Sequence, residues 1–159
     1  MAYREIMDAL ARSAPSAWPF PQAWFQPTDS LGPGGDLAGL IGSTRIQEEE
    51  LGLKPLRPRR AVFTTWPASR LAVFRCRPEM VQDSRIDDPD LLRGVIFHDS
   101  FANALMPFLS EHFSRLVYVH ETFGFDPSLI EAEKPAVVIQ EATERFLMLD
   151  PAPLRKMDP

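Results

Sequence analysis

The sequence predicts an α/β protein built on a parallel β-sheet with flanking helices. Three strand–helix units follow one another in its second half, and each starts with a short apolar run of strand length. The expected strands are residues 94–97, 116–119 and 136–139, and the expected helices are residues 101–112, 126–133 and 141–149. Successive units of this kind imply parallel strands joined by right-handed crossovers.

Length and composition limit the class of protein. A chain of 159 residues with 45% hydrophobic and 25% charged residues suits one domain, and we expect it over residues 1–150 with a frayed tail at 151–159. The net charge of -5 argues against nucleic acid as a partner. A lone cysteine, Cys76, excludes an internal disulfide framework, and we expect no metal or cofactor.

The first third of the chain predicts few regular elements. Residues 1–13 form an amphipathic pattern with Ile6 and Leu10 on its apolar stripe, so we expect a helix. No N-cap residue precedes this helix, as if the chain were the back part of something longer. Residues 14–35 are rich in proline and predict an irregular loop whose aromatic side chains pack onto the body. A short helix is expected at 36–41.

The middle of the chain predicts strands at its edges and a connection between them. Residues 61–65 and 71–76 have β-type composition and indicate a hairpin or two edge strands. Residues 80–92 are polar and indicate a surface connection. The acidic run at 48–50 has no histidine or cysteine near it, so a solvated face is favoured over a metal site.

Ser100 stands at the most informative junction, between the strand at 94–97 and the helix at 101–112. Ligands bind outside the carboxyl ends of parallel strands, and a helix N-terminus offers N–H groups to a developing oxyanion. Ser100 is therefore a candidate nucleophile, with Asp99 beside it. The alternative is that Ser100 only caps its helix, because serine is among the best N-cap residues.

Two segments carry a resemblance to a known family: HDSFANALMPFLSEHFSRLVYVH at 98–120 and FDPSLIEAEKPAVVIQEATERFL at 125–147. They resemble the serine-bearing part of the alginate O-acetyltransferase family, the AlgX/AlgJ type of SGNH-hydrolase-like domain. The resemblance implies an SGNH-hydrolase-like (flavodoxin-like) sheet, Ser100 as nucleophile and its backbone N–H as oxyanion donor. It further implies a periplasmic setting, an exported polysaccharide, an acetyl donor, and other polysaccharide-secretion proteins as partners.

The family's base belongs to an Asp-x-His-Trp motif ahead of the serine, and this sequence has no Asp-x-His. We therefore expect an incomplete domain that turns over slowly or not at all alone. Of the three histidines, His98 adjoins Asp99 but need not reach Ser100, because neighbouring side chains on a strand alternate. His112 lies about 18 Å down the expected helix. His120 ends the next strand at the same sheet edge and is the candidate base, the alternative being a surface or packing role.

Two further residues are candidates for substrate binding. Arg145 lies one helical turn after Glu141, so it either forms a salt bridge with that residue or contacts an anionic sugar. Asn103 follows Ser100 by three residues and is either an oxyanion donor or a surface residue.

The sequence thus supports two classes of function. The first is acyl-ester chemistry on alginate or another exopolysaccharide through an acyl-Ser100 intermediate. The alternative is a non-catalytic carbohydrate-binding or scaffold subunit that uses the aromatic residues of segment 18–25. A third possibility is a remnant with no function of its own.

Overall fold

The computed structural model describes residues 2–12, 14, 17–33, 41–43, 45–67, 81–120 and 125–144. The chain divides into two compact units, one made of residues 1–18 and 60–159 and the other of residues 19–59. That residues 1–150 form one domain stays a prediction. Within the described residues, no helix is long and apolar enough to cross a membrane.

The described strands of the larger unit form one mixed sheet in the order β3-β4-β6-β5-β7. Their bounds are Val62–Thr65 for β3, Val81–Arg85 for β4, Leu92–His98 for β5, Phe113–His120 for β6 and Val137–Gln140 for β7. β5 lies parallel to β6 on one side and to β7 on the other, whereas β4 runs antiparallel to β6 and to β3. The protein is therefore mixed α/β. The expected parallel arrangement is correct for the three strands that carried it and wrong for the sheet as a whole.

The polar segment 80–92 was predicted to be a surface connection, but it contains the strand β4. Its residue Asp83 is fully buried, with its carboxylate 3.0 Å from the Arg85 guanidinium and 3.2 Å from that of Arg115. An acid can occupy the interior of a protein when it is paired in this way. Hydrophobic periodicity does not reveal such a strand, because part of its buried face is polar.

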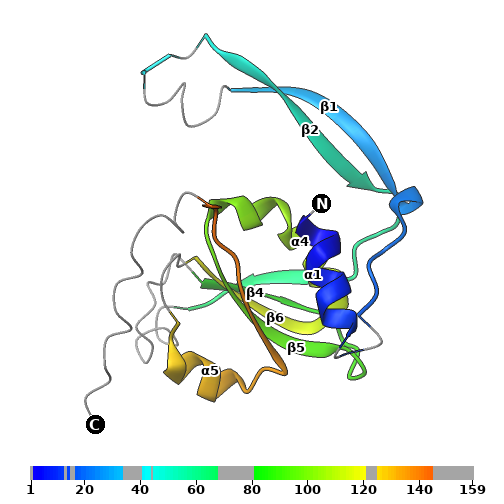
Figure 1. The fold of residues 1–159 in the computed structure, drawn as a ribbon, viewed down its shortest axis with the longest axis vertical. Helices are drawn as coiled ribbons and strands as arrows, with labels where there is room; N and C mark the ends of the chain where they lie inside the picture. The colour runs from blue at the N-terminus through cyan, green and yellow to red at the C-terminus, as the bar shows by residue number, and fades with distance from the viewer. Residues whose placement is uncertain are drawn as a thin grey trace. The chain divides into compact units, whose positions relative to one another are not determined.

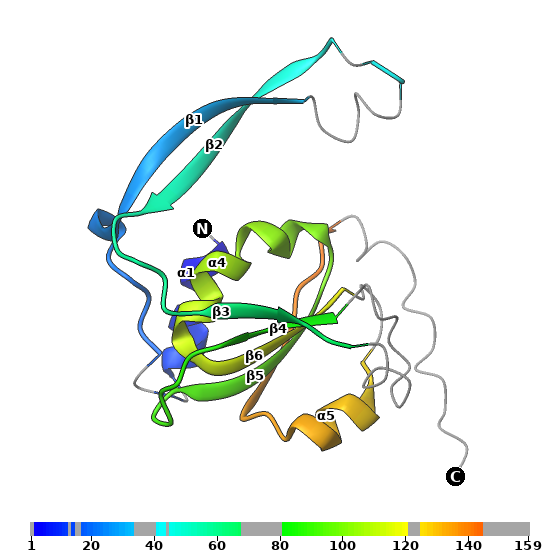
Figure 2. The same ribbon diagram turned by 180° about the vertical axis from the view of Figure 1, so that it is seen from behind.

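Helices cover both faces of the sheet, as Figures 1 and 2 show from opposite sides. On one face, α1 (Ala2–Ala11) and α4 (Met106–Leu109) pack over Ile96, Leu116 and Tyr118. On the other face, Leu129 of α5 (Pro127–Glu133) packs against Phe97 and its neighbours on β5 and β6. β5 and β6 therefore contribute alternate side chains to two separate cores, as expected of strands buried on both faces.

The segment after Ser100 forms three short helical pieces instead of the single helix expected at 101–112. These are the 3₁₀ helix η3 (Ser100–Ala104), α4, and the 3₁₀ helix η4 (Ser110–His112). Pro107 lies in the first turn of α4, where its missing N–H is tolerated. In one continuous helix its ring would clash with the Asn103 carbonyl. Phe101, in η3, is 57% exposed.

The helix α5 forms where the dipeptide Asp126-Pro127 predicts its start. Asp126 Oδ1 accepts hydrogen bonds from the backbone N–H groups of Ser128 and Leu129, at 3.0 and 3.2 Å. Lys134 ends the helix with a left-handed backbone, φ 45°. The expected helix at 1–13 is also confirmed as α1, with Met7 as its fully buried residue.

The smaller unit is a β-hairpin, where the sequence indicated only an irregular loop. The 3₁₀ turn η1 (Gln22–Trp24) leads into β1 (Phe25–Pro33), which pairs antiparallel with β2 (Gln47–Pro55). Both strands of a two-stranded hairpin have a free edge, so prolines within them are tolerated. Trp24 packs at 5.1 Å from the Phe20 ring and under the Arg57 guanidinium at 3.5 Å.

Several expectations fall on other parts of the chain. The strand at 71–76, most of the helix at 36–41, the end of the helix at 141–149 and the tail at 151–159 lie outside the described residues. Glu141–Thr143 belong to no helix or strand. Trp18 is 65% exposed, so the expectation that it packs onto the body is wrong.

Candidate functional site

The parallel strands β5 and β6 end side by side, and both end in histidine. Their register pairs His98 with His120, so the two side chains leave neighbouring strands at the same edge of the sheet. The chain then continues from β5 through Asp99 into η3, whose first residue is Ser100. The expectation that His120 and Ser100 share one sheet edge is therefore confirmed.

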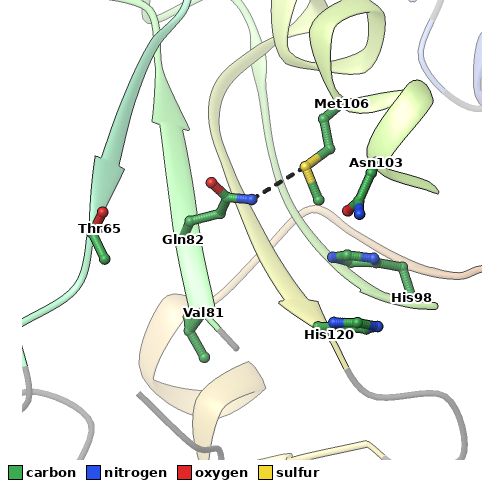
Figure 3. Close-up of a pocket in the computed structure, with 7 residues that line it drawn as sticks. All are labelled: Thr65, Val81, Gln82, His98, Asn103, Met106 and His120. Atoms are coloured by element: carbon green, nitrogen blue, oxygen red, sulfur yellow. Dashed lines mark hydrogen bonds between the residues drawn. The ribbon is translucent and has the colours of Figure 1, made fainter. Parts of the chain in front are cut away.

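A pocket of about 350 Å³ opens beside the two histidines (Figure 3). The lining residues come from β3, β4, β5 and β6 and from the helical pieces η3 and α4. They are Thr65, Val81, Gln82, His98, Asn103, Met106 and His120. The two imidazole rings lie parallel, with centroids 5.4 Å apart and an interplanar angle of 2°. The Gln82 amide donates to Met106 Sδ at 3.2 Å, and Asn103 points toward the His98 ring.

His98 is buried and holds a defined tautomer. Its Nδ1 lies 2.7 Å from the Asp99 backbone carbonyl, an acceptor, so Nδ1 carries the proton and donates. Burial lowers the pKa of His98, and the nearby His120 lowers it further, although the bond to Asp99 works in the opposite direction. The imidazole is therefore neutral at pH 7 and keeps an unprotonated Nε2.

Asp99 ties the start of η3 to the segment after β7. Its Oδ1 accepts from the Phe101 backbone N–H at 2.8 Å, and its Oδ2 accepts from the Thr143 backbone N–H at 2.8 Å and hydroxyl at 2.9 Å. Burial alone would raise the pKa of Asp99, but these hydrogen bonds together lower it. Asp99 is thus a buried, ionised N-cap, and both of its oxygens are engaged within the chain.

Glu141 completes this arrangement on the β7 side. Its Oε2 accepts from the Asp99 backbone N–H at 3.2 Å, and its own N–H donates to the Phe97 carbonyl at 2.9 Å. Burial, with the charge of the Asp99 carboxylate nearby, raises the pKa of Glu141. Arg145, predicted either to form a salt bridge with Glu141 or to contact an anionic sugar, lies outside the described residues, so both roles stay predictions.

Ser100 is exposed, and its hydroxyl has no hydrogen-bond partner among the residues that the structure describes. The cap of η3 is Asp99, so the alternative in which Ser100 serves as the cap is wrong. The Phe101 N–H at the start of η3 is occupied by that cap. This leaves the Ser100 N–H and the Asn103 amide as the expected oxyanion donors near the serine.

The structure brings His120 and Asn103 together and adds His98, which the sequence reasoning set aside. The sequence did contain a pattern that points to His98: side chains alternate along an extended chain, so residues 98 and 100 lie on the same side of it. Ser100 and Asp99 are not among the residues that line the pocket. No sequence pattern pointed to Thr143, which reaches Asp99 from 44 positions away.

The comparisons with known proteins find solved structures that share this mixed α/β architecture. Bacillus cereus PatB1 with a sulfonyl adduct matches with a TM-score of 0.65 and 13% identity, over 93% of this chain and 57% of that one. PatB1 in a second structure matches with a TM-score of 0.62 and 14% identity, over 93% and 59%. A DHHW family protein from Eubacterium siraeum DSM 15702 matches with a TM-score of 0.61 and 14% identity, over 88% and 54%.

These likenesses show the fold alone. The chain spans a little over half the length of the structures that it matches, between 54% and 59% of the three described above. No protein-family model matches it, and no curated protein does. The four-letter motif Asp-His-His-Trp does not occur in this sequence.

Proposed function

We propose that this chain performs acyl transfer of the O-acetyltransferase type, with Ser100 as the residue that carries the acyl group. One observation supports this most: an exposed serine follows a strand whose last residue, His98, lines a pocket together with a second imidazole. The fold shared with PatB1, an acetyltransferase, is in keeping with that chemistry. The acceptor in this proposal is a hydroxyl of an exported polysaccharide such as alginate, and the setting is the periplasm.

The chemistry needs a base for the Ser100 hydroxyl, because a neutral serine is a poor nucleophile. His98 and His120 are the imidazoles at this edge of the sheet. The donors available to a tetrahedral oxyanion are the Ser100 N–H and the Asn103 amide. Met106 and Val81 give the pocket an apolar side against which an acyl methyl can pack.

A sulfonyl or phosphonyl fluoride tests this proposal, because such reagents modify activated serines. We expect labelling at Ser100, located by mass spectrometry of peptides, and its loss in Ser100→Ala. Ser30→Ala is the matched control, since Ser30 is an exposed serine of β1 and its replacement leaves labelling unchanged. Wild-type protein that stays unlabelled at Ser100 refutes the proposal.

Turnover is a second, separate readout. The wild-type chain hydrolyses p-nitrophenyl acetate in a Ser100-dependent reaction if the proposal holds. Burst kinetics that leave an acetyl group on Ser100 identify the acyl-enzyme. Addition of oligosaccharides to the acetylated protein then tests the acceptor, with oligoalginate compared against neutral oligosaccharides of the same length.

A further inference from the structure

We propose that His98, oriented by the Asp99 backbone carbonyl, is the base that serves Ser100. This inference rests on the proposed function and assigns a role within the same site. It differs from the expectation from sequence, in which His120 was the candidate base.

The course of the backbone supports this assignment first. Asp99 is extended, with φ -95° and ψ -171°, so the direction of β5 continues past its last residue. Side chains two positions apart on an extended chain point to the same side, about 6.6 Å apart. His98 and Ser100 therefore share one side. Asp99 points to the other, where Thr143 binds its carboxylate.

The tautomer of His98 is the second argument. A histidine that acts as a base needs its outer nitrogen unprotonated, and an acceptor on the other nitrogen secures this state. Here the Asp99 carbonyl accepts from Nδ1–H at 2.7 Å, which leaves the lone pair on Nε2. No hydrogen bond of the described residues holds the His120 ring in a comparable way.

Burial, together with the charge of the neighbouring His120, lowers the pKa of His98 and keeps it neutral. The titratable groups that face its ring are the parallel ring of His120 and the edge-on ring of Tyr118, both on β6, with Asp99 next to it in the chain. Among the residues that the structure describes, β3, β4 and the helical pieces contribute neutral side chains to the pocket. Positive charge on the neighbouring imidazole disfavours protonation of His98 and so helps to keep its Nε2 free.

The transfer balances without any further group. As Ser100 Oγ attacks the carbonyl carbon of an acyl ester, its proton passes to His98 Nε2. The tetrahedral intermediate collapses, and the leaving alcohol takes that proton from the imidazolium. An acceptor hydroxyl then attacks the acyl-serine, gives its proton to Nε2, and the proton returns to Ser100 Oγ as the ester bond to the serine breaks.

Rates of Ser100 labelling by a fluorophosphonate test this role. We expect His98→Gln to lower the rate constant about 100-fold or more, and the matched variant His120→Gln to lower it less than about tenfold. The wild-type rate rises with pH through an inflection below the ordinary histidine value of 6.5. His120→Gln moves the inflection upward and His98→Gln removes it. Added imidazole restores labelling in His98→Ala, which a purely structural role does not predict.

Each failure points to a different error. Labelling of His98→Gln at the wild-type rate with the same inflection overturns the base role and leaves the proposed function standing. Wild-type protein that is not labelled overturns both. Because His98 is buried, its variants can fail to fold, so NMR of the ¹⁵N-labelled wild-type protein is the second measurement. A proton on Nδ1 of His98 agrees with the inference, and a proton on Nε2 overturns it.

Discussion

The contact between α1 and His112 makes the stability of the fold sensitive to acid. His112 is 6% exposed, and its Nε2 lies 2.7 Å from the Tyr3 hydroxyl. Burial removes water from the imidazolium, and the Arg60 guanidinium repels it, so the pKa of His112 falls to about 4. Protonation of this side chain therefore opposes the packing of α1 on the sheet.

The size of the effect follows from the two states of His112. Its pKa is about 4 in the folded protein and 6.5 when the chain is unfolded. Between these values the unfolded chain binds a proton that the folded chain does not. Stability is therefore complete above pH 6.5 and is lost as the pH falls toward 4. The loss relative to pH 7.5 is about 2 kcal/mol at pH 5 and about 3 kcal/mol at pH 4.

Urea unfolding of the wild-type protein and of His112→Gln measures this term. Glutamine keeps an amide near the Tyr3 hydroxyl and does not titrate, so between pH 7.5 and 5 the wild type loses about 2 kcal/mol more than the variant. Tyr3→Phe is the control that removes the hydrogen bond and keeps the histidine. It lowers stability by about 1 kcal/mol and retains the pH dependence. Parallel stability curves for wild type and His112→Gln, or an NMR titration of His112 near 6.5, refute the reasoning.

Three further predictions concern stability, each measured as the free energy of unfolding in urea. A Cβ at Gly94 meets Leu116 Cδ1 and Phe113 Cε1 at 2.9 Å, so Gly94→Ala costs about 1–3 kcal/mol, and no loss contradicts the tight packing of β5. Leu129→Ala empties a fully buried site under the sheet and costs about 2–5 kcal/mol; a cost below 1 kcal/mol argues that α5 is not docked there. Asp126→Ala removes the cap of α5 and costs about 1 kcal/mol, whereas Asp126→Asn retains most of the stability.

The sequence predicts the fold well where local and tertiary forces agree. β5 and β6 are short apolar runs buried on both faces, and the Asp126 cap specifies the start of α5 by itself. β4 escapes prediction because Asp83 is buried by virtue of its partner Arg115, which is far away in the sequence. The helix predicted after Ser100 is too long because the spacing of its apolar residues is helical, while Pro107 prevents one continuous helix from forming.

For the candidate site, the sequence predicts the edge of the sheet and less of the detail. The position of Ser100 after β5 and of His120 at the end of β6 follows from strand order alone. The contact of Asp99 with Thr143 is not predictable from the sequence, because Thr143 reaches Asp99 only through the placement of β7 beside β5. The tautomer of His98 depends on a contact with a backbone carbonyl, and such a contact cannot be predicted from residue types.

β5 lies between the parallel strands β6 and β7, and this position determines which part of the site is lost first when the sheet opens locally. Amide hydrogens of a strand that is bonded on both sides exchange with solvent slowly, while β7, which lies at the edge among the described strands, opens first. His98 on β5 and His120 on β6 therefore belong to the slowest-exchanging backbone of the sheet. Thr143, by contrast, comes after β7. Fraying of β7 therefore frees Asp99 Oδ2 from Thr143, while Oδ1 keeps its bond to the Phe101 N–H and the two imidazoles stay side by side.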